Sequence, residues 1–144
     1  MNRTTTTTLL AATANIAMAD ELLVHTVSMH TASTYQNDGQ ETKYNNLNLG
    51  IGYRTDGGWQ AGLYYNSYKQ PTAYIANEFM LRPWIGVVIG AGTGYEIPTG
   101  HKIFPIGGVL FKYQVTPQYA LNAMILPPIK DMDGVAHLVV ARKF

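Results

Sequence analysis

Residues 44–54 read YNNLNLGIGYR, and this stretch decides the fold. Leu47, Leu49, Ile51 and Tyr53 occupy alternate positions, with asparagine or glycine between them. An alternation with a period of two predicts a β-strand that has one apolar face and one polar or bare face. The strand therefore lies between two different environments.

The residues that follow this stretch predict its hairpin partner. Asp56, Gly57 and Gly58 offer the positive φ angles that a tight turn needs, and a second alternating run begins at Trp59. Similar patterns predict further strands near residues 22–31, 72–80, 84–94, 104–115, 119–126 and 135–144. Together these segments predict an all-β protein, an eight-stranded antiparallel transmembrane β-barrel with the topology of an up-and-down meander. If the chain enters from the periplasm, the outer loops are residues 33–42, 69–71, 96–103 and 127–134.

A soluble periplasmic barrel of the lipocalin type has the same alternation with its faces reversed, so other features decide between the two. The chain ends on Phe144, with Val140 and Leu138 on the same face and Arg142 interrupting the apolar positions. A terminal aromatic residue is typical of chains that the outer-membrane barrel-assembly machinery inserts. Tyrosine and tryptophan also occur near the predicted strand ends, as an interfacial girdle requires, at Tyr44, Trp59, Trp84, Tyr113 and Tyr119.

The N-terminal residues predict export. Arg3 precedes an alanine-rich stretch, and Ala17-Met18-Ala19 has the small-x-small pattern that signal peptidase cleaves. We therefore expect residues 1–19 to be a signal peptide and residues 20–144 to form a barrel in the bacterial outer membrane; the alternative is a disordered N-terminal tail. No later stretch approaches the roughly 20 apolar residues of a membrane-spanning helix, so spanning requires strands.

Composition argues against several functional classes. The 10 basic and 9 acidic residues give a net charge of +1, and no Lys/Arg cluster suited to nucleic acid is present. The histidines at positions 25, 30, 101 and 137 are scattered, and no pair has the spacing of metal ligands. We expect neither a cofactor nor a metal, and we expect a monomer.

The predicted topology brings one polar pair to the same rim. His30 lies at the outer end of the first strand, on the face of Thr26 and Ser28, and Asn66-Ser67 lies at the outer end of the third. A serine near a histidine base, with an amide that orients the ring, is suited to acyl transfer. The alternative is that these residues solvate the loops, as polar residues do at any rim.

Glycines occupy many positions on the predicted lumen face, namely Gly50, Gly52, Gly62, Gly86, Gly90, Gly92 and Gly94. The missing side chains predict a slot for a hydrocarbon chain. Equally, glycine eases the curvature of a small barrel.

Several motifs in order resemble the outer-membrane lipid A palmitoyltransferase family (PagP). They are Val27-Ser28-Met29-His30, Tyr44-Asn45, Gly50-x-Gly52, Gly58-Trp59-x-x-Gly62-Leu63-Tyr64, Asn66-Ser67, Arg82-Pro83, Ile103-Phe104-Pro105, Ile125-Leu126-Pro127 and the terminal Phe144. The resemblance covers nearly all of residues 20–144. It implies an acyltransferase that moves a fatty acyl chain from a phospholipid to lipid A, with catalytic residues His30 and Ser67 and with Asn66 orienting the histidine.

The resemblance also implies an acyl-chain pocket and a lateral entrance. The pocket residues are Gly50, Gly52, Gly62, Gly90 and Gly92, and Pro105 and Pro127 flank the gate, because proline has no N–H for the strand ladder. The family carries an aspartate where this chain has Asn66, so the charge that stabilises a histidinium is missing there. The alternative is therefore a catalytically silent barrel that acts through its outer loops, by masking a receptor or altering the envelope.

Overall fold

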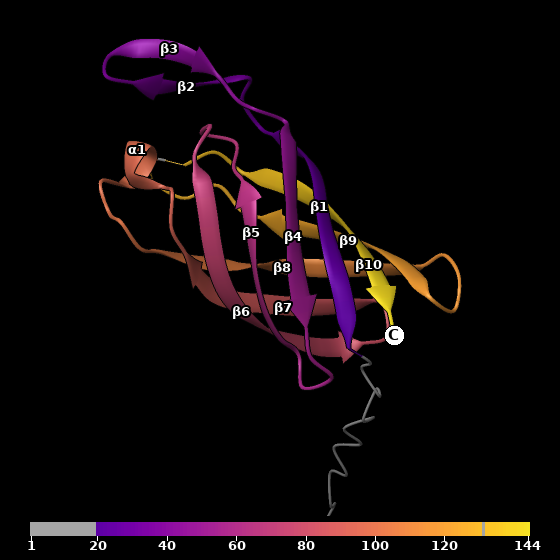
Figure 1. Ribbon diagram of the computed structural model, residues 1–144. Coiled ribbons are helices and arrows are strands. Elements are labelled where there is room, and N and C mark those ends of the chain that lie inside the picture. The colour runs from indigo at the N-terminus through magenta and orange to yellow at the C-terminus, as the bar shows by residue number, and fades with distance from the viewer. Residues whose placement is uncertain (1–19, 131) are drawn as a thin grey trace, which may run out of the picture.

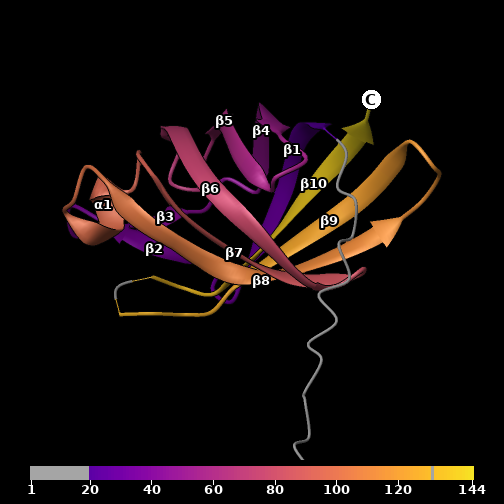
Figure 2. The same ribbon diagram turned by 90° about the horizontal axis from the view of Figure 1, so that it is seen from below.

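Eight antiparallel strands close into a barrel in the computed structural model, which describes residues 20–130 and 132–144 (Figure 1). The strands are β1 (Glu21–His30), β4 (Leu47–Arg54), β5 (Trp59–Tyr65), β6 (Pro71–Arg82), β7 (Ile85–Gly92), β8 (Phe104–Gln114), β9 (Tyr119–Leu126) and β10 (Val135–Lys143). Each pairs with its neighbour along the barrel, and β10 closes it by lying between β9 and β1 (Figure 2). This confirms the all-β, eight-stranded meander, while the expected signal peptide lies outside the described residues.

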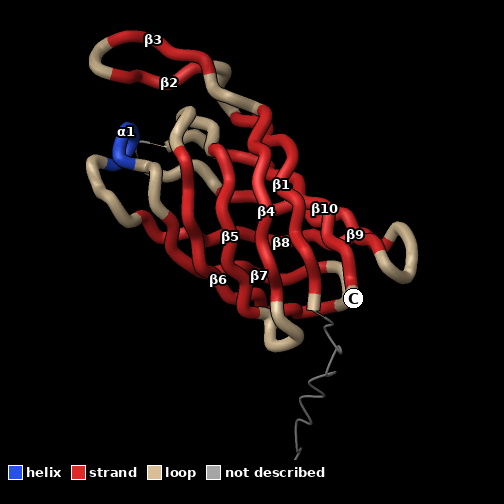
Figure 3. Tube along the Cα trace, in the orientation of Figure 1, coloured by secondary structure: helices blue, strands red, loops and turns tan. Residues whose placement is uncertain are grey.

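The two ends of the barrel differ in the length of their connections. Short turns and the C-terminus lie at one end, which we call the inner end, and the longer loops lie at the other, the outer end (Figure 3). The outer connections include α1 (Glu96–Thr99), a single turn. No helix within the described residues has the length and apolar character to cross a membrane.

The first outer connection is more ordered than the sequence analysis predicted. Residues 33–42 were expected to form a plain loop, but β2 (Thr34–Asn37) and β3 (Gln40–Lys43) form a separate two-stranded sheet that projects from the outer end. Asp38 and Gly39 turn the chain with φ angles of 50° and 76°. A two-residue turn with both φ angles positive matches the twist of a hairpin, so the Asp-Gly pair was the missed signal.

The distribution of side chains is the reverse of that in a soluble protein. Exposed residues along the strands include Leu47, Leu49, Ile51, Leu63, Ile75, Phe79 and Ile89. Buried polar and charged residues include Glu21, His25, Ser28, Asn48, Arg54, Thr72, Glu78, Asn122 and His137. Such a contiguous apolar exterior is stable only against lipid or a partner, and the polar face lines the lumen. The alternation therefore has the orientation predicted for a membrane barrel.

Aromatic side chains gather at the inner end of the barrel exterior. Exposed rings there are those of Tyr53, Trp59, Trp84, Tyr113, Tyr119 and Phe144. Tyr44 was expected in the same girdle but is turned inward, where its ring stacks on His30. The Arg142 guanidinium lies 5.6 Å from the centre of the Phe144 ring, so a cation–π contact accommodates the charge that interrupts the C-terminal apolar positions.

A bulge in β1 changes which residues reach the lumen. His25 pairs with Val139 and Ser28 with His137, so β1 has one extra residue between these two pairs. The Thr26 hydroxyl donates a hydrogen bond to the Leu138 carbonyl at 2.9 Å within this irregular segment. Strict alternation would place His25 on the lipid face, but the bulge lets both His25 and Ser28 face inward.

Candidate functional site

A cavity at the outer end of the lumen contains two of the three predicted catalytic residues. His30 and Ser67 both line it, together with Ser28, Asn48 and Asp133. Its volume is about 50 Å³. The remaining wall contains His137 and otherwise aromatic and apolar side chains, from Tyr64, Tyr68, Tyr95, Phe104, Ile106, Met124, Leu126, Met132 and Val135. Polar groups that converge in an apolar pocket are the usual form of a binding or catalytic site.

Ser67 is held by the neighbouring strands. Its hydroxyl is 3.0 Å from the Ser28 hydroxyl, and the Asn48 amide donates a hydrogen bond to it at 3.4 Å. Ser28 faces the lumen from β1, on the outer side of the bulge. The described contacts of Ser67 do not include a hydrogen bond to His30. If the two side chains act together, they do so by both contacting a molecule bound in the cavity.

His30 is fixed by stacking. Its ring lies parallel to that of Tyr44, with centroids 3.9 Å apart and planes 5° apart. The Tyr44 hydroxyl donates a hydrogen bond to Asp133 Oδ2 at 2.6 Å. Burial, with a further contribution from this hydrogen bond, raises the pKa of the Tyr44 phenol. His30 Nδ1 is buried and has no hydrogen-bond partner among the described side chains, which leaves it available to a ligand.

Asn66 is engaged elsewhere. Its amide nitrogen donates to Thr72 Oγ1 at 3.0 Å and to the Gly94 carbonyl at 2.5 Å. Its oxygen accepts from the backbone amides of Tyr68 at 2.9 Å and Gln70 at 3.0 Å. These contacts use both donors and both acceptors of the side chain. Asn66 therefore shapes the outer loop, and the described geometry gives it no contact through which to orient His30.

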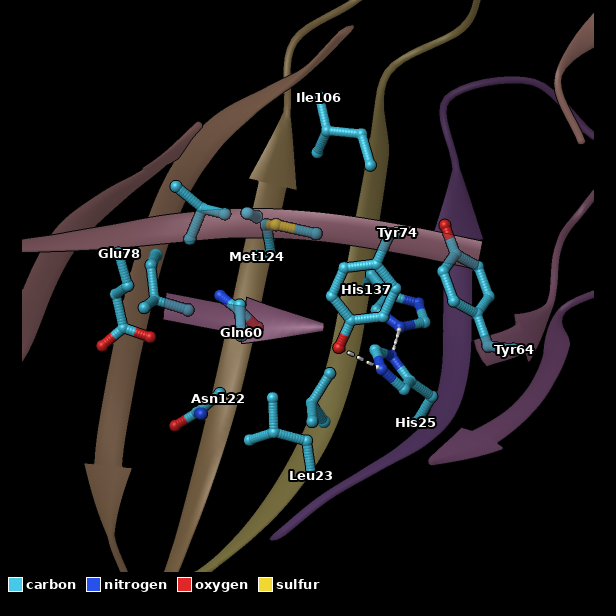
Figure 4. A pocket seen from close by; sticks show the side chains of 14 residues that line it. Leu23, His25, Gln60, Tyr64, Tyr74, Glu78, Ile106, Asn122, Met124 and His137 are labelled. Carbon is cyan, nitrogen blue, oxygen red and sulfur yellow. Dashed lines mark hydrogen bonds between the residues drawn. The ribbon is translucent and has the colours of Figure 1, made fainter. Parts of the chain in front are cut away.

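Sequence reasoning missed a polar network in the middle of the lumen. His25 Nδ1 lies 2.9 Å from His137 Nε2, and His25 Nε2 lies 2.9 Å from the Tyr74 hydroxyl (Figure 4). Tyr64 stacks on His25 with a centroid distance of 4.9 Å. The histidines are 112 positions apart, and only barrel closure together with the bulge brings them together. No group of three His, Cys, Asp or Glu residues in the described part of the chain could hold a metal ion.

The lumen glycines do not leave an open slot among the described side chains. A Cβ on Gly52 would lie 2.5 Å from the Tyr74 hydroxyl, and one on Gly62 would lie 2.8 Å from Tyr74 Cε1. Gly50 is covered by Tyr64, Gly90 by Ala76, and a Cβ on Gly92 would meet Ile106 Cδ1 at 3.0 Å. The cavity beside this network has a volume of about 50 Å³. The glycines therefore make room for tyrosine rings and close strand contacts, which is a correction to the predicted acyl slot.

An apolar crevice instead opens through the barrel wall at the predicted gate. Pairing of β8 with β9 begins at Val109 and Ile125 and runs inward, so residues 104–108 have no β9 partner. The resulting crevice has a volume of about 280 Å³, and both Pro105 and Pro127 line it. It shares part of its wall with the cavity that holds His30 and Ser67, namely Phe104, Ile106, Leu126, Met132, Asp133 and Val135.

The inner half of the lumen is crossed by charged side chains. Arg54 pairs with Glu21 at 2.8 Å and with Glu78 at 3.5 Å, and Lys112 also pairs with Glu78. These residues lie on β4, β1, β6 and β8 and so span the lumen. We call them the charge cluster. A vestibule of about 310 Å³ lies against it and is lined by Arg54, Lys112 and Lys143, among others.

Comparison with known proteins supports the fold. No protein-family model and no curated protein sequence matches the chain. Its structure is similar to the solution structure of outer membrane protein W from E. coli, with a TM-score of 0.50 and 10% sequence identity, covering 90% of this chain and 100% of that one. At this identity the likeness concerns architecture, so the chain has the fold of a small outer-membrane barrel.

Proposed function

We propose that the protein is an outer-membrane acyltransferase that takes an acyl chain from the surrounding lipid and transfers it at the outer end of its lumen. The observation that carries the proposal is the shared wall between the lateral crevice and the cavity of His30 and Ser67. An ester that lies at this wall has apolar surface on one side and a histidine on the other.

The apolar exterior supports a membrane location. The exposed aliphatic face and the aromatic ring at the inner end match a barrel that spans a bilayer, and the outer membrane is where such barrels occur. Export would use residues 1–19 as a cleaved signal peptide. The C-terminal Phe144, exposed at the barrel edge, fits recognition by the barrel-assembly machinery.

The volumes of the lumen cavity and of the lateral crevice determine which part of a lipid each can hold. A cavity of roughly 150 Å³ holds one benzene molecule, so the lumen cavity of about 50 Å³ has room only for the ester end of a lipid. The crevice of about 280 Å³ has room for a longer hydrocarbon segment. Most of the chain therefore stays in the crevice and in the lipid beside it, while the carbonyl points at His30.

The chemistry of transfer follows from the side chains at this end. His30 takes the proton from the acceptor hydroxyl as that oxygen attacks the acyl carbonyl, and the same proton then goes to the oxygen of the departing lysophospholipid. One ester bond forms and one breaks. The Ser67 and Ser28 hydroxyls line the same cavity and are placed to donate hydrogen bonds to the developing oxyanion. The donor is a phospholipid, and the acceptor is lipid A.

The test is acyl transfer by the barrel in detergent micelles, with radiolabelled palmitoyl phospholipid and lipid A. We expect label in lipid A with the wild type and a loss of about 100-fold or more with His30→Ala, as for removal of a general base. His101→Ala is the matched control, because His101 is exposed on an outer loop. Equal rates for wild type and His30→Ala would refute the proposal.

A second candidate function acts through the outer loops. The β2–β3 hairpin projects beyond the barrel, and Asn66 is committed to loop structure, which together suit a catalytically silent protein that masks a receptor or alters the envelope. Under this alternative, replacement of residues 34–43 by a short Gly-Ser turn changes the phenotype of producing cells and His30→Ala does not. The opposite pattern favours the enzyme.

A further inference from the structure

Asp133 is the one carboxylate in the lining of the described outer cavity. It lines the same cavity as His30 and Ser67, and it accepts the hydrogen bond of Tyr44, whose ring covers His30. Asp133 comes from the connection between β9 and β10, far in sequence from the Asn66-Ser67 pair.

The backbone fixes Asp133 at this place. Thr31 and Gly134 join the end of β1 to the start of β10, because the Thr31 amide donates to the Gly134 carbonyl at 2.9 Å and the Gly134 amide donates to Thr31 Oγ1 at 3.1 Å. Asp133 precedes Gly134 directly, so its carboxylate is tied to the strand end that carries His30. A residue held in this way keeps its position when a ligand enters the cavity.

We propose that Asp133 is the positioning carboxylate of His30, so that Asp133, Tyr44 and His30 form one unit. The proposal rests on the acyl transfer proposed above. Asn66 cannot take this part, because its four hydrogen-bonding positions are occupied by Thr72, Gly94, Tyr68 and Gln70.

The unit acts when His30 holds the proton of the acceptor hydroxyl. The imidazolium then faces the Tyr44 ring, and the electron-rich face of an aromatic ring attracts a cation. The Asp133 carboxylate stabilises the same charge, and its hydrogen bond from Tyr44 keeps the tyrosine ring parallel to the imidazole. No proton is transferred to Asp133, and the proton leaves His30 with the lysophospholipid.

The decisive experiment compares kcat and KM of palmitoyl transfer for Asp133→Asn, Asp133→Glu and Tyr44→Phe. We expect Asp133→Asn to lower kcat by about 10- to 100-fold with KM unchanged, which is less than the roughly 100- to 10,000-fold contributed by the acid–base residue itself, because Asp133 acts through His30. Asp133→Glu restores part of kcat, and Tyr44→Phe, which keeps the ring and loses the hydrogen bond, falls between wild type and Asp133→Asn. Asp38→Asn, the same change at the exposed tip of the hairpin, leaves kcat as it is.

A second measurement reports on the unit without turnover. The Tyr44 hydroxyl is 2.6 Å from Asp133 Oδ2, so its proton should give a downfield-shifted, slowly exchanging NMR signal in micelles that is lost in Tyr44→Phe and weakened in Asp133→Asn. If the wild type is as inactive as His30→Ala, the proposed function fails and this inference fails with it. If the wild type is active and Asp133→Asn keeps its kcat, or if Asp133→Asn fails to fold and Tyr44→Phe keeps its kcat, the inference alone is overturned.

Discussion

The outer and inner halves of the lumen are built in opposite ways from the same eight strands. In the outer half the ladder between β8 and β9 is interrupted, a crevice reaches the lipid side, and His30 Nδ1 has no described partner. In the inner half β8 and β9 pair without interruption, and the charge cluster crosses the lumen with Arg54 and Glu21 each 1% exposed. The difference separates a half that can admit a ligand from one that holds the barrel together.

The largest expected effect is loss of the charge cluster. Arg54→Leu leaves Glu21 and Glu78 buried without their shared cation, and breaking a buried ion pair typically costs about 3–5 kcal/mol. We expect the midpoint of urea unfolding in micelles to fall accordingly, while the exposed Arg82→Leu has little effect. Similar midpoints for the two variants would mean that the inner half is not the stabilising one.

A smaller loss of stability is expected from a substitution at Gly62, where the two halves of the lumen meet. A Cβ on Gly62 would lie 2.7 Å from Gly52 Cα and 2.6 Å from the Ile51 carbonyl oxygen. Gly62→Ala therefore overpacks the lumen, at a cost of about 1–3 kcal/mol in the free energy of unfolding. Gly107→Ala is the control, because a Cβ there meets nothing within 4 Å. Equal stability of both variants would contradict the tight fit between glycines and tyrosines.

The same open space beside Gly107 provides a test of the crevice. Gly107 lines it, so Gly107→Leu narrows the proposed lipid entrance with little strain on the barrel. We expect kcat/KM for palmitoyl transfer to fall about tenfold, equivalent to about 1.4 kcal/mol of transition-state stabilisation, with unfolding unchanged. Short acyl chains should be affected less than long ones. A uniform loss for all chain lengths would argue against entry by this route.

The smallest effect concerns Asp20 at the inner end. A hydrogen bond from Tyr53, followed by one from the Asp56 amide, lowers the pKa of the Asp20 carboxyl from its usual value of 3.8. Because the pKa is lower in the folded protein, the ionised carboxylate stabilises the fold at every pH above 3.8. This contribution to the free energy of unfolding is lost as the pH falls through the pKa of the folded state. Asp20→Asn should therefore unfold with a weaker acid dependence, and salt should shrink the difference because the carboxylate is in contact with solvent. An unchanged acid profile would show that these hydrogen bonds do not persist in solution.

The fold could be predicted because it depends on the alternation of apolar and polar side chains within each strand. Alternation at Leu47, Leu49 and Ile51 gives a strand with a lipid face, and repetition of this pattern leaves the closed barrel as the way to pair every backbone group in a membrane. Pro105 lies in the part of β8 that has no β9 partner and Pro127 directly follows β9, while their role as a lateral gate stays a prediction. These features depend on nearest neighbours and on strand order.

Features that depend on register could not be predicted. One extra residue in β1 brings His25 into the lumen, and nothing in the local sequence around Thr26 announces the bulge. Asp133 was assigned to a loop, and its contact with Tyr44 joins residues 89 positions apart. The glycine faces were recognised, but the tyrosines that cover them come from other strands: Tyr64 on β5 covers Gly50 on β4, and Tyr74 on β6 covers Gly52 on β4.

The aromatic rings at the inner end set the depth of the barrel in the bilayer from that end. Indole and phenol groups prefer the level of the lipid headgroups, so this end is anchored. Any change in hydrocarbon thickness is then accommodated at the opposite rim, where the gap between β8 and β9 opens. In a thick membrane the gap between β8 and β9 lies among the acyl chains, and in a thin one it lies closer to the headgroups. Bilayer thickness therefore determines which segment of a lipid lies beside the gap.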